Sequence, residues 1–358
     1  MSYKHCLRFI AVIVMLAACS GPSVPNQSAT HTPGSAVATA PGASSSSDQK
    51  LVIYSGRNEN LVGPLIERFK IETGIDVQVR YGETAEMAAT ILEEGANSPA
   101  DVFFGQDAGA LGALAQAGRL TVLPGDLLAR VAPRFRAKDG HWIGTSGRAR
   151  VLVYNTGEVK AEELPQDIWG MTDPKWKGKV GWAPSNGSFQ AFVTALRVIE
   201  GDEKAQLWLE DMVKNDTKVY ANNDAIVAAV ANGEIPTGLV NHYYMHRYQA
   251  EHGGNAPIAN YYFPAGGAGA LINVASVGIL NTSRRQDAAK QFVTFLLNDE
   301  AQQYFAAETD EYPLVGGTIQ TNPAVKPIGE IAAPDIDLGN LKDLQGTLEL
   351  LQRVGTLN

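Results

Sequence analysis

Apolar and polar positions change period repeatedly once the chain passes residue 50. Residues 51–56 form an apolar run that ends in a turn, which is typical of a buried strand. Leu61, Leu65 and Phe69 then recur at helical spacing until Gly74 interrupts the pattern. The same change of period repeats downstream, so we predict further strands over 75–81 and 100–104 and further helices over 86–94 and 111–117.

A second set of elements with the same alternation follows from residue 148. We predict strands over 148–155, 179–182, 237–240 and 270–280, and helices over 189–199, 205–213, 222–232, 245–251, 286–298 and 341–354. Strands that alternate with helices indicate an α/β fold with mostly parallel sheets. Such sheets bind ligands beyond the carboxyl ends of their strands, which in the first half of the chain are residues 55–59 and 105–107.

The length of this part of the chain indicates more than one hydrophobic core. About 310 residues follow the first 49, more than a single core usually organises, so we expect two lobes. The predicted boundaries place 50–149 and 273–323 in lobe 1 and 150–272 and 324–358 in lobe 2. The chain would then cross between the lobes near Arg150 and Asn273, and these two crossovers would form a hinge.

The N-terminus has the order of features expected of a targeting signal. Lys4 and Arg8 precede an apolar run over 9–18, which is too short to span a bilayer permanently. The run ends in Leu16-Ala17-Ala18-Cys19, which resembles the lipobox of bacterial lipoproteins, in which the cysteine becomes the lipidated N-terminus. We therefore predict a signal peptide over 1–18 and a lipid on Cys19. The alternative is a buried N-terminal helix with an incidental cysteine.

The composition of residues 19–49 and the net charge of the chain limit the kinds of molecule that the protein could bind. This segment is rich in Ser, Ala, Thr, Pro and Gly and has no aromatic residue, so we predict a lipid-anchored, disordered linker. Loss of residues 1–18 would lower the net charge from −9 to −11, because two basic residues leave with them. Such an acidic chain argues against nucleic acid as a partner. The chain without residues 1–18 would keep Cys19 as its single cysteine, which excludes an internal disulfide or a thiolate metal site.

Two adjacent tyrosines, Tyr243 and Tyr244, are the first candidates for chemistry. They lie between the strand predicted over 237–240 and the helix predicted over 245–251, and at such a junction both phenols can point the same way. A helix N-terminus favours an anion. Phenols titrate near pH 10, so they need a neighbour such as a trivalent cation to ionise at neutral pH. The alternatives are two aromatic residues packed in a core, or a stacking site for a sugar.

A short polar turn is the second candidate. Asn186, Gly187 and Ser188 separate the strand over 179–182 from the helix over 189–199. Backbone N–H groups at such a helix start can hold an anion. An ordinary capped turn would have the same residues.

Taken together, these features resemble the ferric-ion-binding proteins that feed bacterial ATP-driven importers. The resemblance runs from about residue 51 to the C-terminus. It is carried by seven stretches in order: Tyr54-Ser55-Gly56, Ser98-Pro99-Ala100-Asp101-Val102-Phe103, Ser146-Gly147-Arg148-Ala149-Arg150, Pro174-Lys175-Trp176-Lys177-Gly178, Asn232-Gly233-Glu234, Asn241-His242-Tyr243-Tyr244 and Glu311-Tyr312-Pro313-Leu314. It implies a two-lobed clamshell of the type II kind that holds ferric iron between its lobes.

The resemblance also implies roles for particular residues. Tyr243 and Tyr244 match the iron-binding pair. The residues that match the anion site and its flanking polar contacts are Asn186, Gly187, Ser188, Arg148, Asn223 and Asn241. Where the family often has His and Glu as first-lobe ligands, this chain has Asn58 and Gln106, so first-lobe contacts would come from these amides or from Glu59 or Asp107.

The resemblance implies a binding protein rather than an enzyme. It would carry Fe3+ with a synergistic anion such as carbonate or phosphate, or as a chelate, to an importer permease. It would act as an extracytoplasmic monomer that touches the membrane only through its lipid. The alternatives are a binding protein for an organic or anionic solute without iron, a zinc enzyme built on His242 and His246, whose spacing suits one helix face, and a structural surface protein.

Overall fold

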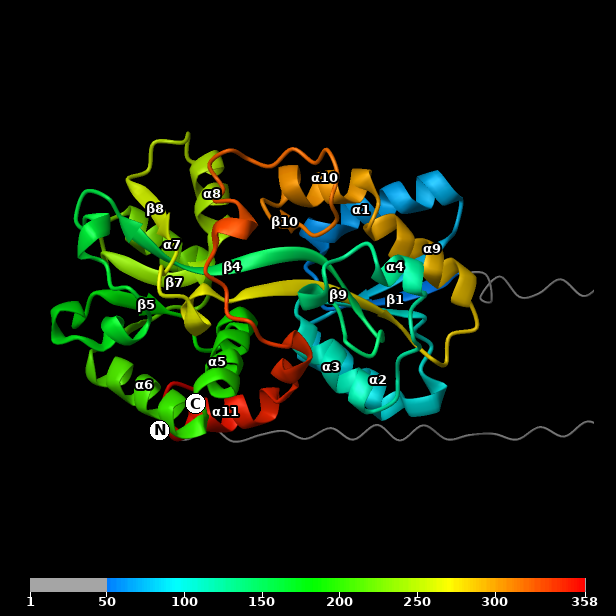
Figure 1. The fold of residues 1–358 in the computed structure, drawn as a ribbon, viewed down its shortest axis with the longest axis horizontal. Helices are drawn as coiled ribbons and strands as arrows, with labels where there is room; N and C mark the ends of the chain where they lie inside the picture. Colours follow the sequence, from blue (N-terminus) through cyan, green and yellow to red (C-terminus); the bar gives the residue numbers. More distant parts are fainter. Residues whose placement is uncertain (1–49, 358) are drawn as a thin grey trace, which may run out of the picture. The chain divides into compact units, whose positions relative to one another are not determined.

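The computed structural model describes residues 50–357, so the predicted signal peptide, Cys19 and the linker lie outside the described residues. Strands and helices alternate along this part of the chain, as the periodicity predicts (Figure 1). Among the residues described, no helix combines the length and apolar character needed to cross a bilayer. The α/β class predicted from the sequence is confirmed.

The first sheet combines parallel and antiparallel pairs. Its strands in order are β2 (Val77–Tyr81), β1 (Leu51–Ser55), β3 (Val102–Gly105), β9 (Ile272–Ile279) and the first part of β4 (Ile143–Asn155), with β10 (Tyr312–Pro313) on the other side of β4. β1 runs parallel to β2 and β3, whereas β9 is antiparallel to both β3 and β4. The carboxyl ends of β1 and β3 therefore meet at one edge, where Ser55 is the register partner of Phe104.

The second sheet continues from the other end of β4. Its strands in order are β4, β7 (Thr237–Asn241), β5 (Val180–Trp182) and β6 (Lys218–Val219), and β8 (Ile258–Tyr261) also pairs with β4. β7, β5 and β6 run parallel, so their carboxyl ends share one edge. Three helices begin just beyond that edge: α5 (Gly187–Glu200), α7 (Asn223–Ala231) and α8 (His242–Glu251).

Because β4 is a member of both sheets, hydrogen bonding passes from one to the other without a break. Ala149 is the register partner of Ile272 in β9, and the next residue, Arg150, is the partner of Asn241 in β7. β4 begins at Ile143, five residues before the predicted strand. Residues 143–147 contain two glycines and two hydroxyl residues, so their apolar pattern is weak, and pairing with β9 makes them a strand.

Helices pack on the two sheets around separate aromatic groups. In Figure 1, α1 (Glu59–Thr73) and α9 (Gln286–Leu296) lie above the first sheet, and α2 (Thr84–Glu94) and α3 (Ala108–Gln116) lie below it. Phe69 of α1 packs edge-on against Phe292 of α9, with ring centroids 5.1 Å apart. In the second sheet, Trp182 packs against Phe189 of α5 and against Trp208. The helices that complete these layers are α4 (Gly125–Leu128), α6 (Asp202–Lys214) and α10 (Asp299–Glu308). The sequence pattern predicted α6 but neither α4 nor α10.

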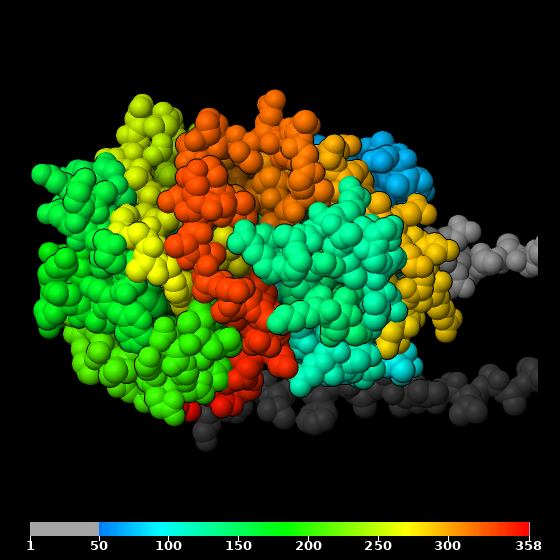
Figure 2. Space-filling view, viewed as in Figure 1, coloured from blue at the N-terminus to red at the C-terminus, as the bar shows by residue number. Residues whose placement is uncertain are grey.

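The C-terminal stretch contacts both halves of the described chain. In Figure 2 this stretch, coloured orange to red, lies between the green and the cyan parts. Its 3-10 helix η9 (Leu338–Lys342) packs so closely on α3 that a Cβ at Gly109 would lie 2.2 Å from the Leu341 carbonyl oxygen. The helix that follows, α11 (Leu344–Arg353), packs on α5, where Thr194 and Thr347 share a hydrogen bond of 2.8 Å.

Candidate metal and anion site

Tyr243 and Tyr244 lie in the first turn of α8, at the junction where β7 ends. Asn241 is the extended N-cap residue, and the helix begins at His242, three residues earlier than predicted. The two tyrosine rings stack, with centroids 4.4 Å apart and planes 29° apart. Tyr243 is buried and Tyr244 is half-buried. Stacking at a helix start thus directs both phenols to the same side, which neighbours in mid-helix could not do.

The Tyr243 phenol is strongly held in its neutral form. Burial raises its pKa well above 10, and the adjacent Tyr244 raises it further, while the Arg148 guanidinium opposes both. At neutral pH the hydroxyl therefore keeps its proton unless a cation binds the oxygen. The site is consequently one where cation binding and proton release are coupled.

His242 is fully buried beside the tyrosines and uses both ring nitrogens. Nδ1 accepts a hydrogen bond from the Ala149 N–H at 3.2 Å, so Nε2 carries the proton and donates to the Asp310 carbonyl at 2.8 Å. Burial lowers the His242 pKa to about 3, which keeps the ring neutral. With both ring nitrogens engaged, His242 has no free nitrogen to share a zinc ion with His246 in this arrangement.

The predicted anion turn is assembled at the start of α5. Asn186 caps the helix, and its Oδ1 accepts from the Ser188 N–H at 3.0 Å and from the Ser188 hydroxyl at 2.6 Å. Asn223, at the start of α7, donates from Nδ2 to the same Oδ1 and to the Ser188 Oγ, both at 3.1 Å. Gly187, between Asn186 and Ser188, is exposed. The structure therefore brings Asn186, Ser188 and Asn223 together, as the carboxyl ends of neighbouring parallel strands require.

Arg148 and Arg150 place two buried guanidiniums near the tyrosines. They alternate along β4 and so lie on one face of it. Arg150 stacks over Phe189 and Phe192 of α5, at 5.5 Å and 5.2 Å from the ring centroids, and donates to the Leu239 carbonyl. Burial lowers its pKa to about 9, a shift opposed by the nearby Tyr244 and Tyr243 hydroxyls. Burial likewise lowers the pKa of Arg148, against the influence of Tyr243.

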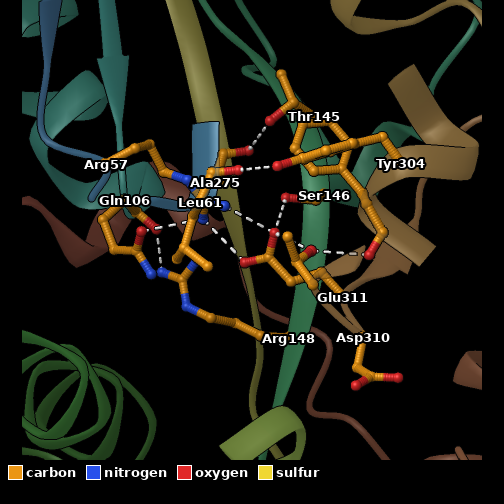
Figure 3. A network of polar contacts seen from close by, with 12 residues as sticks. Arg57, Leu61, Gln106, Thr145, Ser146, Arg148, Ala275, Tyr304, Asp310 and Glu311 are labelled. Carbon is orange, nitrogen blue, oxygen red and sulfur yellow. Dashed lines mark hydrogen bonds and ion pairs between the residues drawn. The ribbon is translucent and has the colours of Figure 1, made fainter. Parts of the chain in front are cut away.

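A third buried guanidinium, that of Arg57, lies at the carboxyl end of β1 (Figure 3). It forms a two-point ion pair with Glu311, which also accepts from the Ser146 hydroxyl at 2.9 Å. Burial disfavours the charged form of both side chains. The charge and hydrogen bonds of Arg57 nevertheless lower the pKa of Glu311, and those of Glu311 raise the pKa of Arg57. Arg148 joins this network by donating to the Gln106 carbonyl.

The candidate first-lobe ligands are all engaged or turned outward. The Gln106 Oε1 accepts from Arg57 Nη1 at 3.0 Å. Asn58 is exposed and caps α1 by accepting from the Asn60 N–H at 2.9 Å, and Glu59 is exposed as the first residue of α1. Asp107 caps α3 through Ala110. The charged side chains that act on the Tyr243 phenol are instead those of Arg148, Glu311 and Arg57.

Three site residues were missed from the sequence: Arg57, Arg150 and Glu311. For Arg150 a signal existed, because two arginines at alternate positions in an apolar strand must share one buried face. Among the described residues, His, Cys, Asp and Glu side chains form no group of three or more that could hold a metal.

Comparisons with known proteins show which family the chain resembles as a whole. A family model described as bacterial extracellular solute-binding protein matches residues 64–327. The Fe(3+)-binding periplasmic protein of Serratia marcescens is 32% identical over 313 residues, which cover 87% of this chain and 92% of that protein. Iron-bound HitA from Pseudomonas aeruginosa superposes with a TM-score of 0.80 at 34% identity, over 86% of this chain and 99% of that one. A Trichodesmium protein (IdiA, FutA) in complex with iron and citrate gives a TM-score of 0.75 at 30% identity, with the same coverage.

Proposed function

This chain belongs to the family of bacterial extracellular solute-binding proteins, and from that premise we propose that it captures ferric iron outside the cytoplasm and delivers it to an ATP-driven importer. Its fold is the two-domain fold of periplasmic binding proteins, which the resemblance in sequence implied. The relatives named above bind iron or solutes, and we propose binding rather than catalysis for this chain as well.

The stacked tyrosine pair is the observation that carries this proposal. Two phenol oxygens directed to one side are suitable ligands for a hard trivalent cation. Arg148 and Arg150 would stabilise the phenolates that form when the cation binds, because an opposite charge favours ionisation. A packed aromatic core would need no buried guanidiniums around it, since unpaired buried charges are destabilising.

An anion held at the start of α5 is proposed to complete the coordination. The supporting contacts are those of Asn186, Ser188 and Asn223, beside the Arg150 guanidinium. Carbonate and phosphate are the simplest anions of this kind. Asn186→Asp should weaken iron binding in bicarbonate or phosphate buffer, because it places a negative charge where the anion sits. An unchanged iron affinity in Asn186→Asp would mean that this turn only caps the helix and holds no anion.

We propose that the lobes are 50–149 with 273–323 and 150–272 with 324–358, and that iron is held between them. The change of partners along β4 at Ala149 and Arg150 supports this division, and β4 and β9 would then supply the hinge. The C-terminal stretch is assigned to lobe 2 through α11, although η9 also contacts α3.

The N-terminal sequence supports an extracytoplasmic, lipid-anchored monomer. Cys19 would carry the lipid and provide the sole contact with the membrane, and the linker would let the folded part reach the importer permease. Cys19→Ala should release the protein from the membrane fraction, because the lipid on Cys19 is the anchor proposed here. If the variant remains in that fraction with the mass of a lipidated protein, the lipobox assignment is wrong.

Iron loading of two single variants tests the function itself. The loaded protein should contain about one iron and show a phenolate-to-iron charge-transfer band. Tyr243→Phe and Tyr244→Phe should each bleach or shift the band and weaken binding, while the stability of the iron-free protein changes by about 1 kcal/mol or less. Tyr248→Phe is the matched control, because Tyr248 lies further along α8 and stacks on His252. Iron binding that survives both single substitutions would favour the alternative, a binding protein for another solute.

A further inference from the structure

His242 connects the tyrosine pair to a segment that lies far away in the chain. Its imidazole is completely buried and directly precedes Tyr243. Nε2 donates to the Asp310 carbonyl at 2.8 Å, and the ring stacks on that of Tyr312, with centroids 4.4 Å apart and planes 15° apart. Two of the stretches that carry the resemblance in sequence therefore meet at this imidazole.

The remaining contacts of His242 fix it to the second sheet and to the tyrosines. Nδ1 accepts from the Ala149 N–H, at the point where β4 changes partners from β9 to β7. The His242 carbonyl accepts from Asn260 Nδ2, in β8, at 2.7 Å. The imidazole also meets the Tyr243 ring edge-on, with centroids 5.8 Å apart. A displacement of the imidazole would therefore displace Tyr243 with it.

The segment 310–312 is itself firmly held by the first sheet. Glu311 forms the buried ion pair with Arg57 at the end of β1 (Figure 3), and Tyr312 pairs with Gly147 of β4. Asp310 has a φ of 51°, which is uncommon for a residue other than glycine, and such a backbone persists only where its surroundings impose it. The Asp310 carbonyl is thus presented to His242 in a fixed direction.

In the proposed division of the chain, this contact crosses from one lobe to the other. His242 belongs to lobe 2, which carries both phenols on α8, and Asp310 belongs to lobe 1. A rotation about the proposed hinge that carries α8 away from Asp310 must break the bond from Nε2 and leave a buried donor without an acceptor, which is unfavourable. The position of the phenols is therefore linked to the contact between the lobes.

We propose that His242 is a positioning residue for ferric iron: its bond to the Asp310 carbonyl holds the start of α8 against lobe 1 and so slows the release of the cation. Because both ring nitrogens are engaged, His242 acts through Tyr243 and not on the iron itself. This inference rests on the proposed function and adds to it a residue that governs how long the iron is retained.

Two substitutions separate the two ring nitrogens. The amide of asparagine reaches about as far as Nδ1, and the amide of glutamine reaches about as far as Nε2. His242→Asn therefore keeps an acceptor for the Ala149 N–H and loses the bond to Asp310, whereas His242→Gln keeps a donor for Asp310 and loses the bond to Ala149. Each variant retains one of the two hydrogen bonds.

The rate of iron release distinguishes a positioning residue from a structural one. Full-length protein is loaded with iron(III) in bicarbonate buffer and mixed with excess chelator, and the loss of the charge-transfer band is followed in time. We expect His242→Asn to release iron at least about tenfold faster than the parent and His242→Gln to stay within about threefold of it, because one hydrogen bond corresponds to about tenfold in a rate or equilibrium. His252→Asn, at the exposed end of α8, is the control and should release iron at the parent's rate.

The other outcomes are equally informative. Parent-like release by His242→Asn, or release by His242→Gln as fast as by His242→Asn, would overturn the positioning role, even if both variants unfold at a lower temperature. The proposed function would stand in either case, since the parent still binds iron. A parent that binds no iron and shows no charge-transfer band would overturn the proposed function, and the positioning role with it.

Hydrogen exchange of the unsubstituted protein tests the same link if a variant fails to fold. The Glu311 N–H, which bonds to the Phe305 carbonyl at 3.0 Å, reports on the segment that receives the His242 bond. Iron loading should slow exchange at 309–313, because a cation on the phenols holds α8 in place, and should leave exchange around Gly74, at the end of α1, unchanged. Equal exchange at 309–313 with and without iron would overturn the positioning role.

Discussion

Arg57 and Glu311 are 254 positions apart in the chain and form a bidentate ion pair, with Nη1–Oε1 at 2.9 Å and Nη2–Oε2 at 2.8 Å. Both side chains are buried. The pair joins the loop after β1 to the segment between α10 and β10, and through Gln106 it reaches the end of β3. One interaction therefore sets the positions of the polar residues that end two neighbouring strands of the first sheet.

Removing the charge of Glu311 should be strongly destabilising. Glu311→Gln leaves the Arg57 guanidinium buried without a counter-charge, and breaking a buried pair in this way costs about 3–5 kcal/mol in unfolding free energy. Glu300→Gln is the control, because Glu300 pairs with Arg68 at 3.6 Å on the surface, where such pairs contribute about 0–1 kcal/mol. Denaturant titration of the two variants gives the comparison, and equal losses would contradict the buried pair.

The pKa of Glu311 also predicts how stability responds to acid. Because that pKa is lowered in the folded protein, the contribution of the ionised carboxylate is complete above the unfolded value of about 4.3 and is lost as the pH falls through the folded value. Thermal unfolding temperatures measured from pH 7 down to pH 2 should fall more steeply below about pH 4.3 in the parent than in Glu311→Gln. Parallel curves would show that Glu311 does not titrate in this way.

Iron binding should release protons and weaken in acid. The Tyr243 pKa is raised in the iron-free protein, so the phenol must lose a proton when the cation binds its oxygen. Each proton released lowers the affinity by about tenfold per pH unit. Competition against a chelator of known affinity at several pH values measures this slope, and Tyr243→Phe should make it shallower by about one proton. An identical slope in that variant would mean that Tyr243 is not a ligand.

A methyl group on α3 should displace η9. In Gly112→Ala the new Cβ would lie 2.6 Å from the Gly339 carbonyl oxygen, an overpacked contact that costs about 1–3 kcal/mol. Gly125→Ala is the control, because a Cβ at Gly125 would have no neighbouring atom within 4 Å. Hydrogen exchange around residues 338–343 should speed up in Gly112→Ala alone. If both variants exchange at the parent's rate, the contact between η9 and α3 is looser than described.

Local patterns were sufficient to predict the parts of the site that a single turn of chain defines. The tyrosine junction followed from an apolar run that stops at Asn241, and the turn before α5 followed from Asn186, whose side chain caps the helix. In both places the backbone geometry depends on residues only a few positions apart, so the sequence pattern and the structure agree.

Contacts between distant segments could not be predicted in the same way. Nothing near Gln106 in the sequence indicates that its side-chain oxygen is taken by Arg57, or that Glu311 neutralises that arginine. The start of β4 was missed for a related reason, because its glycines and hydroxyl residues become a strand only through pairing with β9. Such features depend on which strands become neighbours, a property of the whole chain.

The position of β9 has a consequence for how the protein is made. β9 lies between β3 and β4, although it comes from residues 272–279, long after β3 ends at Gly105. The first sheet therefore lacks the strand that joins β3 to β4 until the ribosome has synthesised most of the chain. Pairing of strands so far apart in sequence is slow. The N-terminal half stays open meanwhile, a state in which a polypeptide can still be threaded through a secretion channel before it folds on the far side.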